Sequence, residues 1–98
     1  MKHVILNCKK LLQKEEAHTY LAQMLDFPDY YGNNLDALFD CLTELEECTI
    51  VLEEEATLRQ TEGYGKQILN VLKEAAQINP NLKLEIQENP VHDLTENV

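Results

Sequence analysis

Short apolar runs alternate along this chain with longer segments whose apolar residues recur every three or four positions. The runs lie at residues 3–6, 49–52 and 82–86. The first two are continuous, as in buried strands, and the third alternates apolar with polar residues, as in a half-buried strand. The segments between the runs have the period of amphipathic helices instead. The pattern therefore predicts three strands separated by helices.

Two helices are expected between the first and second strands. The first spans residues 14–26 and ends before Pro28, and its apolar face is made of Ala17, Tyr20, Leu21, Met24 and Leu25. The second spans residues 35–45 with Asn33 or Asn34 as its cap, and its apolar stripe is made of Leu35, Leu38, Leu42 and Leu45.

Two further helices are expected between the second and third strands. A weak one covers residues 54–62, and a firmer one begins after the turn at residues 63–65 and runs to about Ile78. Pro80 bars its continuation. This order of elements predicts an α/β fold with a three-stranded parallel sheet, because helical crossovers favour parallel strands and right-handed connections. We place one domain at residues 1–88 and expect the polar residues 89–98 to form a poorly ordered tail.

Acidic residues dominate the charge of the chain, which has a net charge of −10 and a sequence pI near 4.5. Between Glu15 and Leu58 there are twelve carboxylates and no lysine or arginine. A field of this sign repels nucleic acid and anionic membranes and accelerates encounter with a basic protein, although it also serves solubility alone. We therefore expect neither a nucleic-acid nor a membrane partner.

The location is expected to be cytoplasmic. The N-terminal apolar run is too short for a signal peptide, and no stretch approaches the length of a membrane span. The three cysteines, Cys8, Cys41 and Cys48, are an odd number without metal-site spacing. Buried or idle thiols in a reducing compartment account for them.

The stretch DYYGNNLDALFDCL, from Asp29 to Leu42, places unpaired acids beside aromatic and amide side chains. Asp36 and Asp40 are one helical turn apart, so their carboxylates point the same way, and like charges at that spacing cost a helix about 0.2–0.5 kcal/mol. One of Tyr30 and Tyr31 is expected to be a core residue of the loop. The face of the second helix next to the leucine stripe is too polar for a core and suits a positively charged partner; it carries Asp36, Phe39, Asp40 and Thr43.

Paired carboxylates are also typical of glycosidases and metal sites, but neither site fits this pattern. Asp36 and Asp40 lie on an ordinary helical face with no histidine nearby in sequence. With Gly32 at the sixth position of a calcium loop, Phe27 and Tyr31 fall where an EF-hand needs oxygen ligands. The sequence thus predicts no catalytic activity, no metal and no cofactor. An enzyme that uses the two acids on a small substrate remains an alternative.

Residues 28–42 closely resemble the barstar family, the intracellular inhibitors of barnase-type ribonucleases. The shared pattern is Pro-acid-Tyr-Tyr-Gly-x-Asn-Leu-Asp-Ala-Leu-aromatic-Asp-Cys-Leu, and looser similarity covers residues 4–7, 50–53 and 71–75. The resemblance implies a bacterial immunity protein, or antitoxin, whose acidic helix and loop block a ribonuclease active site by mimicking RNA phosphates. The binding residues that it implies are Tyr30, Asn34, Asp36, Phe39, Asp40, Thr43 and Glu74.

The resemblance also implies individual roles. Asp40 would take the phosphate position against arginines and a histidine of the enzyme, and Asp36 would meet a second basic group. Tyr30 would pack on the catalytic histidine, and Asn34 would hydrogen-bond the substrate-recognition loop. Glu74, on the last helix, would add an acidic contact at the edge of the interface.

Three positions depart from barstar itself. Phe39 and Leu45 stand where barstar has tryptophans, and Ile78 stands where it has a glutamate. The expected partner is a basic, extracellular-type ribonuclease similar to barnase, and the free inhibitor is expected to be a monomer. The alternative is a binding module of the same fold that regulates a basic protein other than a ribonuclease.

Overall fold

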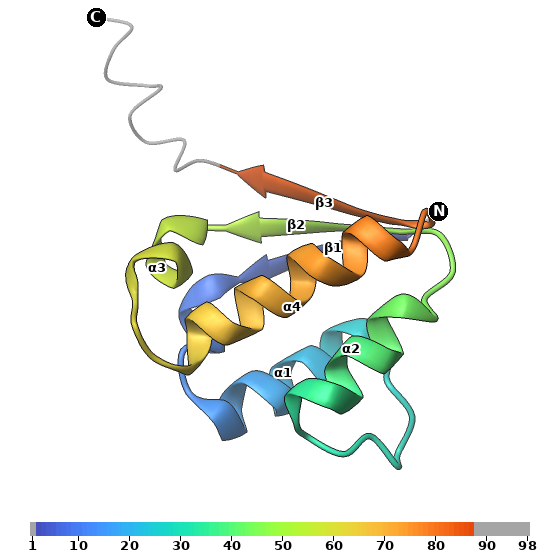
Figure 1. Ribbon diagram of the computed structural model, residues 1–98, viewed down its shortest axis with the longest axis horizontal. Helices are drawn as coiled ribbons and strands as arrows, with labels where there is room; N and C mark the ends of the chain where they lie inside the picture. Colours follow the sequence, from blue (N-terminus) through green and yellow to red (C-terminus); the bar gives the residue numbers. More distant parts are fainter. Residues whose placement is uncertain (1, 88–98) are drawn as a thin grey trace, which may run out of the picture.

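The computed structural model of the protein describes residues 2–87 (Figure 1). The predicted tail at residues 89–98 lies outside the described residues. Three parallel strands form one sheet in the order β1-β2-β3: β1 (Lys2–Asn7), β2 (Cys48–Glu53) and β3 (Leu82–Gln87). Val4 is paired with Ile50, and Ile50 with Leu84. The predicted α/β class and parallel sheet are confirmed.

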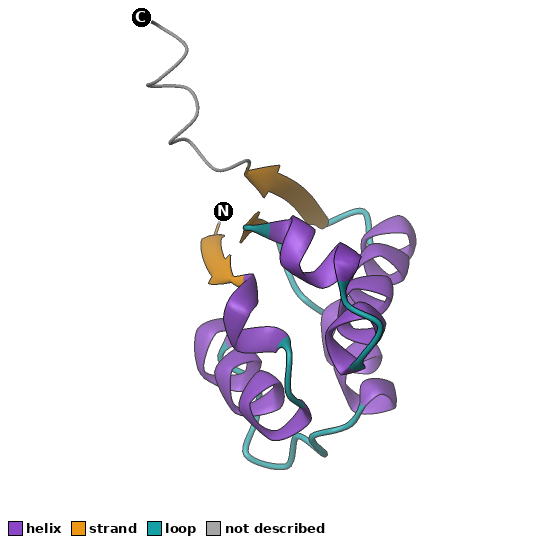
Figure 2. Cartoon of the chain, turned by 90° about the vertical axis from the view of Figure 1, so that its left-hand side faces the viewer, coloured by secondary structure: helices purple, strands orange, loops and turns teal. Residues whose placement is uncertain are grey.

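The four predicted helices are present, each within a few residues of its expected bounds. They are α1 (Lys14–Leu25), α2 (Leu35–Thr43), α3 (Glu55–Gln60) and α4 (Tyr64–Ile78). A short 3-10 helix that the sequence pattern did not indicate, η1 (Cys8–Leu11), follows β1. All of these helices lie on one side of the sheet (Figures 1 and 2). No helix within residues 2–87 is long and apolar enough to cross a membrane.

One hydrophobic core fills the space between the sheet and the helices. Alternate strand residues point into it, and the burial of Leu6, Ile50 and Leu52 is complete. The helices contribute mainly leucines, including Leu38 and Leu42 from α2 and Leu72 from α4. No helix of residues 2–87 covers the opposite face of the sheet (Figure 2), and Ile5 there is half exposed. Because the leucine stripe of α2 packs into this core, on the side of α4, the polar face of α2 is left outward.

The face that α1 buries differs from the prediction at two positions. Ala17, Leu21 and Leu25 are buried as expected, but Met24 is exposed and His18 is almost completely buried. His18 tolerates this position because both of its ring nitrogens have hydrogen-bond partners from other elements.

Candidate protein-binding surface

The loop between α1 and α2 carries two adjacent tyrosines with opposite orientations. Tyr31 is 9% exposed and packs against the ring of Phe27, with 4.8 Å between the ring centroids. Tyr30 is 87% exposed. The prediction that one of the two belongs to the core is confirmed, and the other is presented to solvent at the edge of α2.

A buried histidine fixes the inward tyrosine. The Nδ1 atom of His18 lies 2.6 Å from Oη of Tyr31, and its Nε2 atom lies 2.7 Å from Oη of Tyr64 at the start of α4. A neutral imidazole has one donor and one acceptor nitrogen, so one hydroxyl donates to the ring and the other accepts from it. Burial lowers the pKa of His18 and therefore favours this neutral form. The trio ties the loop to both α1 and α4.

Both ends of α2 are held by asparagine side chains. At its start, Oδ1 of Asn34 accepts a hydrogen bond from the backbone N–H of Ala37 at 2.7 Å, which is the usual N-cap contact. At its end, Nδ2 of the buried Asn79 donates to the carbonyls of Leu42 and Leu45, each at 3.0 Å. These bonds satisfy backbone groups that a helix end otherwise leaves unpaired. The helix is therefore fixed at both ends as well as along its buried stripe.

The predicted binding residues fall on one connected region of the loop, α2 and the adjacent α4. Asn34, Asp36 and Asp40 are exposed, and Phe39 and Thr43 are half-buried. Phe39 packs against the edge of the core. Glu74 is exposed on α4, the helix that packs directly against α2. Part of the Asn34 side chain is occupied by the helix cap, and its Nδ2 group donates to the carbonyl of Gly32 at 3.3 Å.

The acids of α2 are not neutralised by any cation within residues 2–87. The ion pairs in this part of the chain join Lys9 to Glu54 at 3.4 Å and Arg59 to Glu55 at 3.0 Å, away from α2. Glu55 is buried and paired with the exposed Arg59, whereas Asp36 and Asp40 are open to solvent. A rigid helix thus presents two unpaired carboxylates beside an exposed tyrosine.

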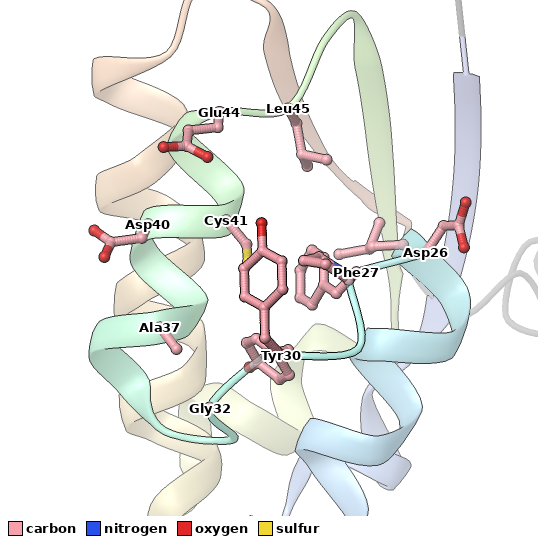
Figure 3. Close-up of a pocket in the computed structure, with 12 residues that line it drawn as sticks. Asp26, Phe27, Tyr30, Gly32, Ala37, Asp40, Cys41, Glu44 and Leu45 are labelled. Carbon is pink, nitrogen blue, oxygen red and sulfur yellow. The ribbon is translucent and has the colours of Figure 1, made fainter.

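A hollow of about 500 Å³ separates the loop from α2 (Figure 3). Cys41 points from α2 toward the loop, and Phe27 lies across from it. Burial raises the pKa of the Cys41 thiol, and the nearby Glu44 and Asp40 carboxylates raise it further. The residues that line the hollow are Leu25, Asp26, Phe27, Pro28, Tyr30, Tyr31, Gly32, Ala37, Asp40, Cys41, Glu44 and Leu45.

Sequence reasoning missed three residues of this region. His18 and Asn79 do not face outward, but they hold the loop and α2 in place, and each acts on residues distant in the chain. Glu44 is exposed at the C-terminal end of α2 and lines the hollow. A local signal for Glu44 was available, because it continues the four-residue spacing of Asp36 and Asp40.

No group of three or more potential metal-ligating side chains is brought together within residues 2–87. Cys8 and Cys48 are buried and Cys41 is half-buried, and all three are free thiols. Asp40 borders the hollow but Asp36 does not, so the two acids are not brought into one pocket. The arrangement favours contact with a partner surface over catalysis by a carboxylate pair.

The fold and the surface define a small α/β domain in which helices cover one face of a parallel sheet and an acidic helix and its loop lie exposed. Residues 1–88 match the family model described as "Barstar (barnase inhibitor)", and the chain belongs to this family. It is also 40% identical over 78 residues to "Putative ribonuclease inhibitor YrdF" of Bacillus subtilis (strain 168). That alignment covers 76% of this chain and 86% of its relative.

Proposed function

We propose that the protein inhibits a basic, barnase-type ribonuclease by covering its active site with the acidic face of α2 and the preceding loop. The observation that carries this proposal is that α2, held at both ends, presents Asp36 and Asp40 without an ion-pair partner among residues 2–87, beside the 87%-exposed Tyr30. An active site that binds RNA is lined with cations. Carboxylates at fixed positions can replace the phosphates there.

Asp40 is the central contact of the proposed interface. It is exposed on α2, so docking on this face removes it from water together with the cations that it meets. Charge-assisted hydrogen bonds in such a site are shorter and stronger than neutral ones. Asp36 pairs with a second cation, and Tyr30 packs on the catalytic histidine. Asn34 hydrogen-bonds the substrate-recognition loop through the side-chain N–H and the oxygen lone pair that its contacts with Gly32 and Ala37 leave unused. Glu74 acts mainly on the rate of encounter.

The biological setting follows from the same proposal. A cell that secretes such a ribonuclease needs an inhibitor in the cytoplasm, where the enzyme is made. The protein then acts there as an immunity protein, or antitoxin, and a monomer with one binding face is sufficient. Phosphate mimicry by carboxylates requires no cofactor.

The test is a titration of the purified protein into barnase and related guanyl-preferring ribonucleases while RNA cleavage is followed. Stoichiometric inhibition is expected. Asp40→Ala should weaken inhibition at least about a hundredfold, because removing one partner of a desolvated ion pair costs roughly 3–5 kcal/mol. Glu62→Ala, which removes an exposed acid between α3 and α4, is the charge-matched control and should stay within a few-fold of wild type.

Each outcome has a distinct meaning. Inhibition that Asp40→Ala leaves unchanged would keep the family function and refute the proposed surface. Absence of inhibition across the panel would refute the ribonuclease target and favour the alternative, a regulator of another basic protein. The observation that favours this alternative is the difference from barstar at Phe39, Leu45 and Ile78.

A further inference from the structure

The hollow beside α2 combines an apolar interior with an acidic edge. Aromatic and aliphatic groups from the loop form one wall, with Phe27 facing Cys41 on α2 (Figure 3). Three acidic residues are among those that line it, Asp40 and Glu44 on the α2 side and Asp26 on the loop side. In Figure 3 the carboxylate of Asp40 points outward from α2, away from the loop. Its lining, as far as residues 2–87 form it, contains no lysine, arginine or histidine. The volume of about 500 Å³ is within the range of sites that bind small molecules or single side chains.

The charge of Glu44 does not serve the helix on which it lies. Glu44 is the C-cap residue of α2, and the last turn of that helix contains no basic side chain. A negative charge at the C-terminal end opposes the helix dipole, and the spacing of four residues from Asp40 adds like-charge repulsion. Among residues 2–87 Glu44 has no ion-pair partner. Glu44 lies instead at the edge of an aromatic-walled hollow, where its charge can pair with a cation of a partner.

We propose that Glu44 and this hollow form a specificity pocket for one arginine side chain of the partner protein. This inference rests on the proposed function in one respect, that a basic protein docks on α2. Glu44 is a contact separate from Asp40, four residues further along the chain at the C-terminal end of α2, next to Leu45 (Figure 3).

Arginine is the cation that fits these walls. Its guanidinium is planar and weakly hydrated, stacks on aromatic rings and forms paired hydrogen bonds with a carboxylate. The aliphatic part of the arginine side chain can lie against Leu45 and Cys41, while its guanidinium reaches Glu44. A lysine ammonium is strongly hydrated and gains less from aromatic walls. The pocket therefore selects among basic partners instead of attracting all of them equally.

The first test needs no ribonuclease. N-acetyl-arginine amide is titrated into the 15N-labelled protein, with the uncharged citrulline analogue in parallel. Saturable shifts confined to residues 25–32 and 37–45 are expected, with a dissociation constant on the order of millimolar for so small a ligand. Glu44→Gln should weaken binding at least about fivefold, and Leu45→Trp, which fills the hollow, should abolish it. The charge-matched Glu62→Gln variant should bind as wild type.

Equal binding of the arginine and citrulline probes, or equal effects of Glu44→Gln and Glu62→Gln, would overturn the pocket. The second test repeats the ribonuclease titration with the same two variants. A loss of inhibition specific to Glu44→Gln supports the pocket within the interface. Inhibition that the two variants change equally overturns the pocket and leaves the proposed function standing. Saturable arginine binding without inhibition of any ribonuclease retains the pocket and overturns the proposed function.

Discussion

The imidazole of His18 and the hydroxyl of Tyr31 are joined inside the protein by a hydrogen bond of 2.6 Å. One residue belongs to α1 and the other to the loop that presents Tyr30. The second ring nitrogen of His18 binds the hydroxyl of Tyr64, so a single side chain connects the loop to two helices. The position of the proposed binding loop is thus determined by a polar contact in the core.

Acidification is expected to destabilise the folded protein through His18. Burial, with a smaller contribution from Lys14, lowers the pKa of His18 below its usual 6.5, so the unfolded chain takes up a proton before the folded one does. The stabilisation is complete above about pH 6.5 and is lost as the pH falls below that value. The free energy of unfolding should decline by at most about 1.4 kcal/mol per pH unit from this group.

Urea unfolding at a series of pH values from about 8 to about 5 measures this slope. The variant His18→Gln keeps polar atoms near both tyrosines but does not titrate, so its curve should be flatter over that interval. His3 is exposed, and His3→Gln is the matched control that should retain the wild-type slope. Identical slopes in His18→Gln and wild type would show that His18 is not the titrating group.

The two neighbouring tyrosines offer a matched pair of substitutions. Tyr31→Phe removes the hydroxyl that pairs with His18 and leaves a buried nitrogen without its partner, so we expect a loss of about 1–3 kcal/mol in the free energy of unfolding. Tyr30→Phe changes an 87%-exposed side chain and should stay within about 0.5 kcal/mol of wild type. Denaturant unfolding of both variants gives the comparison, and equal losses would refute the assignment of Tyr31 as the structural tyrosine.

Asn79 is expected to be important for stability although it lies far from α2 in the chain. Its amide donates to the carbonyls of Leu42 and Leu45, and its Oδ1 accepts from the backbone of Asn81 at 2.9 Å. Asn79→Ala leaves these buried groups unpaired and should cost roughly 1–3 kcal/mol or more. Asn70→Ala, at an exposed position of α4, is the control and should cost little. Hydrogen exchange of Asn79→Ala should show faster opening of the last turn of α2, and unchanged protection there would contradict the role.

The strands and helices could be predicted from the sequence because each is specified by the apolar pattern of neighbouring residues. The continuous runs at residues 3–6 and 49–52 and the leucine stripe of α2 each specify an element from neighbouring residues alone. The assignment of Met24 to the buried face of α1 was wrong for the opposite reason. His18 is buried in its place because the hydroxyls of Tyr31 and Tyr64 satisfy its two ring nitrogens. Tyr64 is 46 residues away, so no local pattern indicates this contact.

The candidate site divides in the same way. Tyr30, Asp36 and Asp40 stand in one short stretch whose polarity conflicts with a core, so the sequence alone was enough to name them as candidates. The hollow depends instead on how the loop and α2 are spaced, which is fixed by Tyr31 in the core and by Asn79 at the helix end. Contacts of that range leave no periodic signal in a sequence.

A substitution of Ile78 is expected to accelerate association with the partner. It is 62% exposed in the last turn of α4, one turn beyond Glu74, on the helix that packs against α2. Ile78→Glu adds a carboxylate at the rim of the proposed interface. We expect association with a basic ribonuclease to accelerate about two- to fivefold at low salt, since a rim charge acts through long-range attraction. High salt should remove most of the gain, because the Debye length at 1 M is about 3 Å.

Stopped-flow association at two ionic strengths measures this effect. Ile5→Glu makes the same chemical change at a half-exposed position on the opposite face of the sheet, so it alters the net charge without approaching the partner. It should change the association rate much less. The stability of Ile78→Glu should remain within about 0.5 kcal/mol of wild type, as is usual for an exposed position. If both variants accelerate association equally, net charge alone governs the encounter, and this end of α4 lies outside the interface.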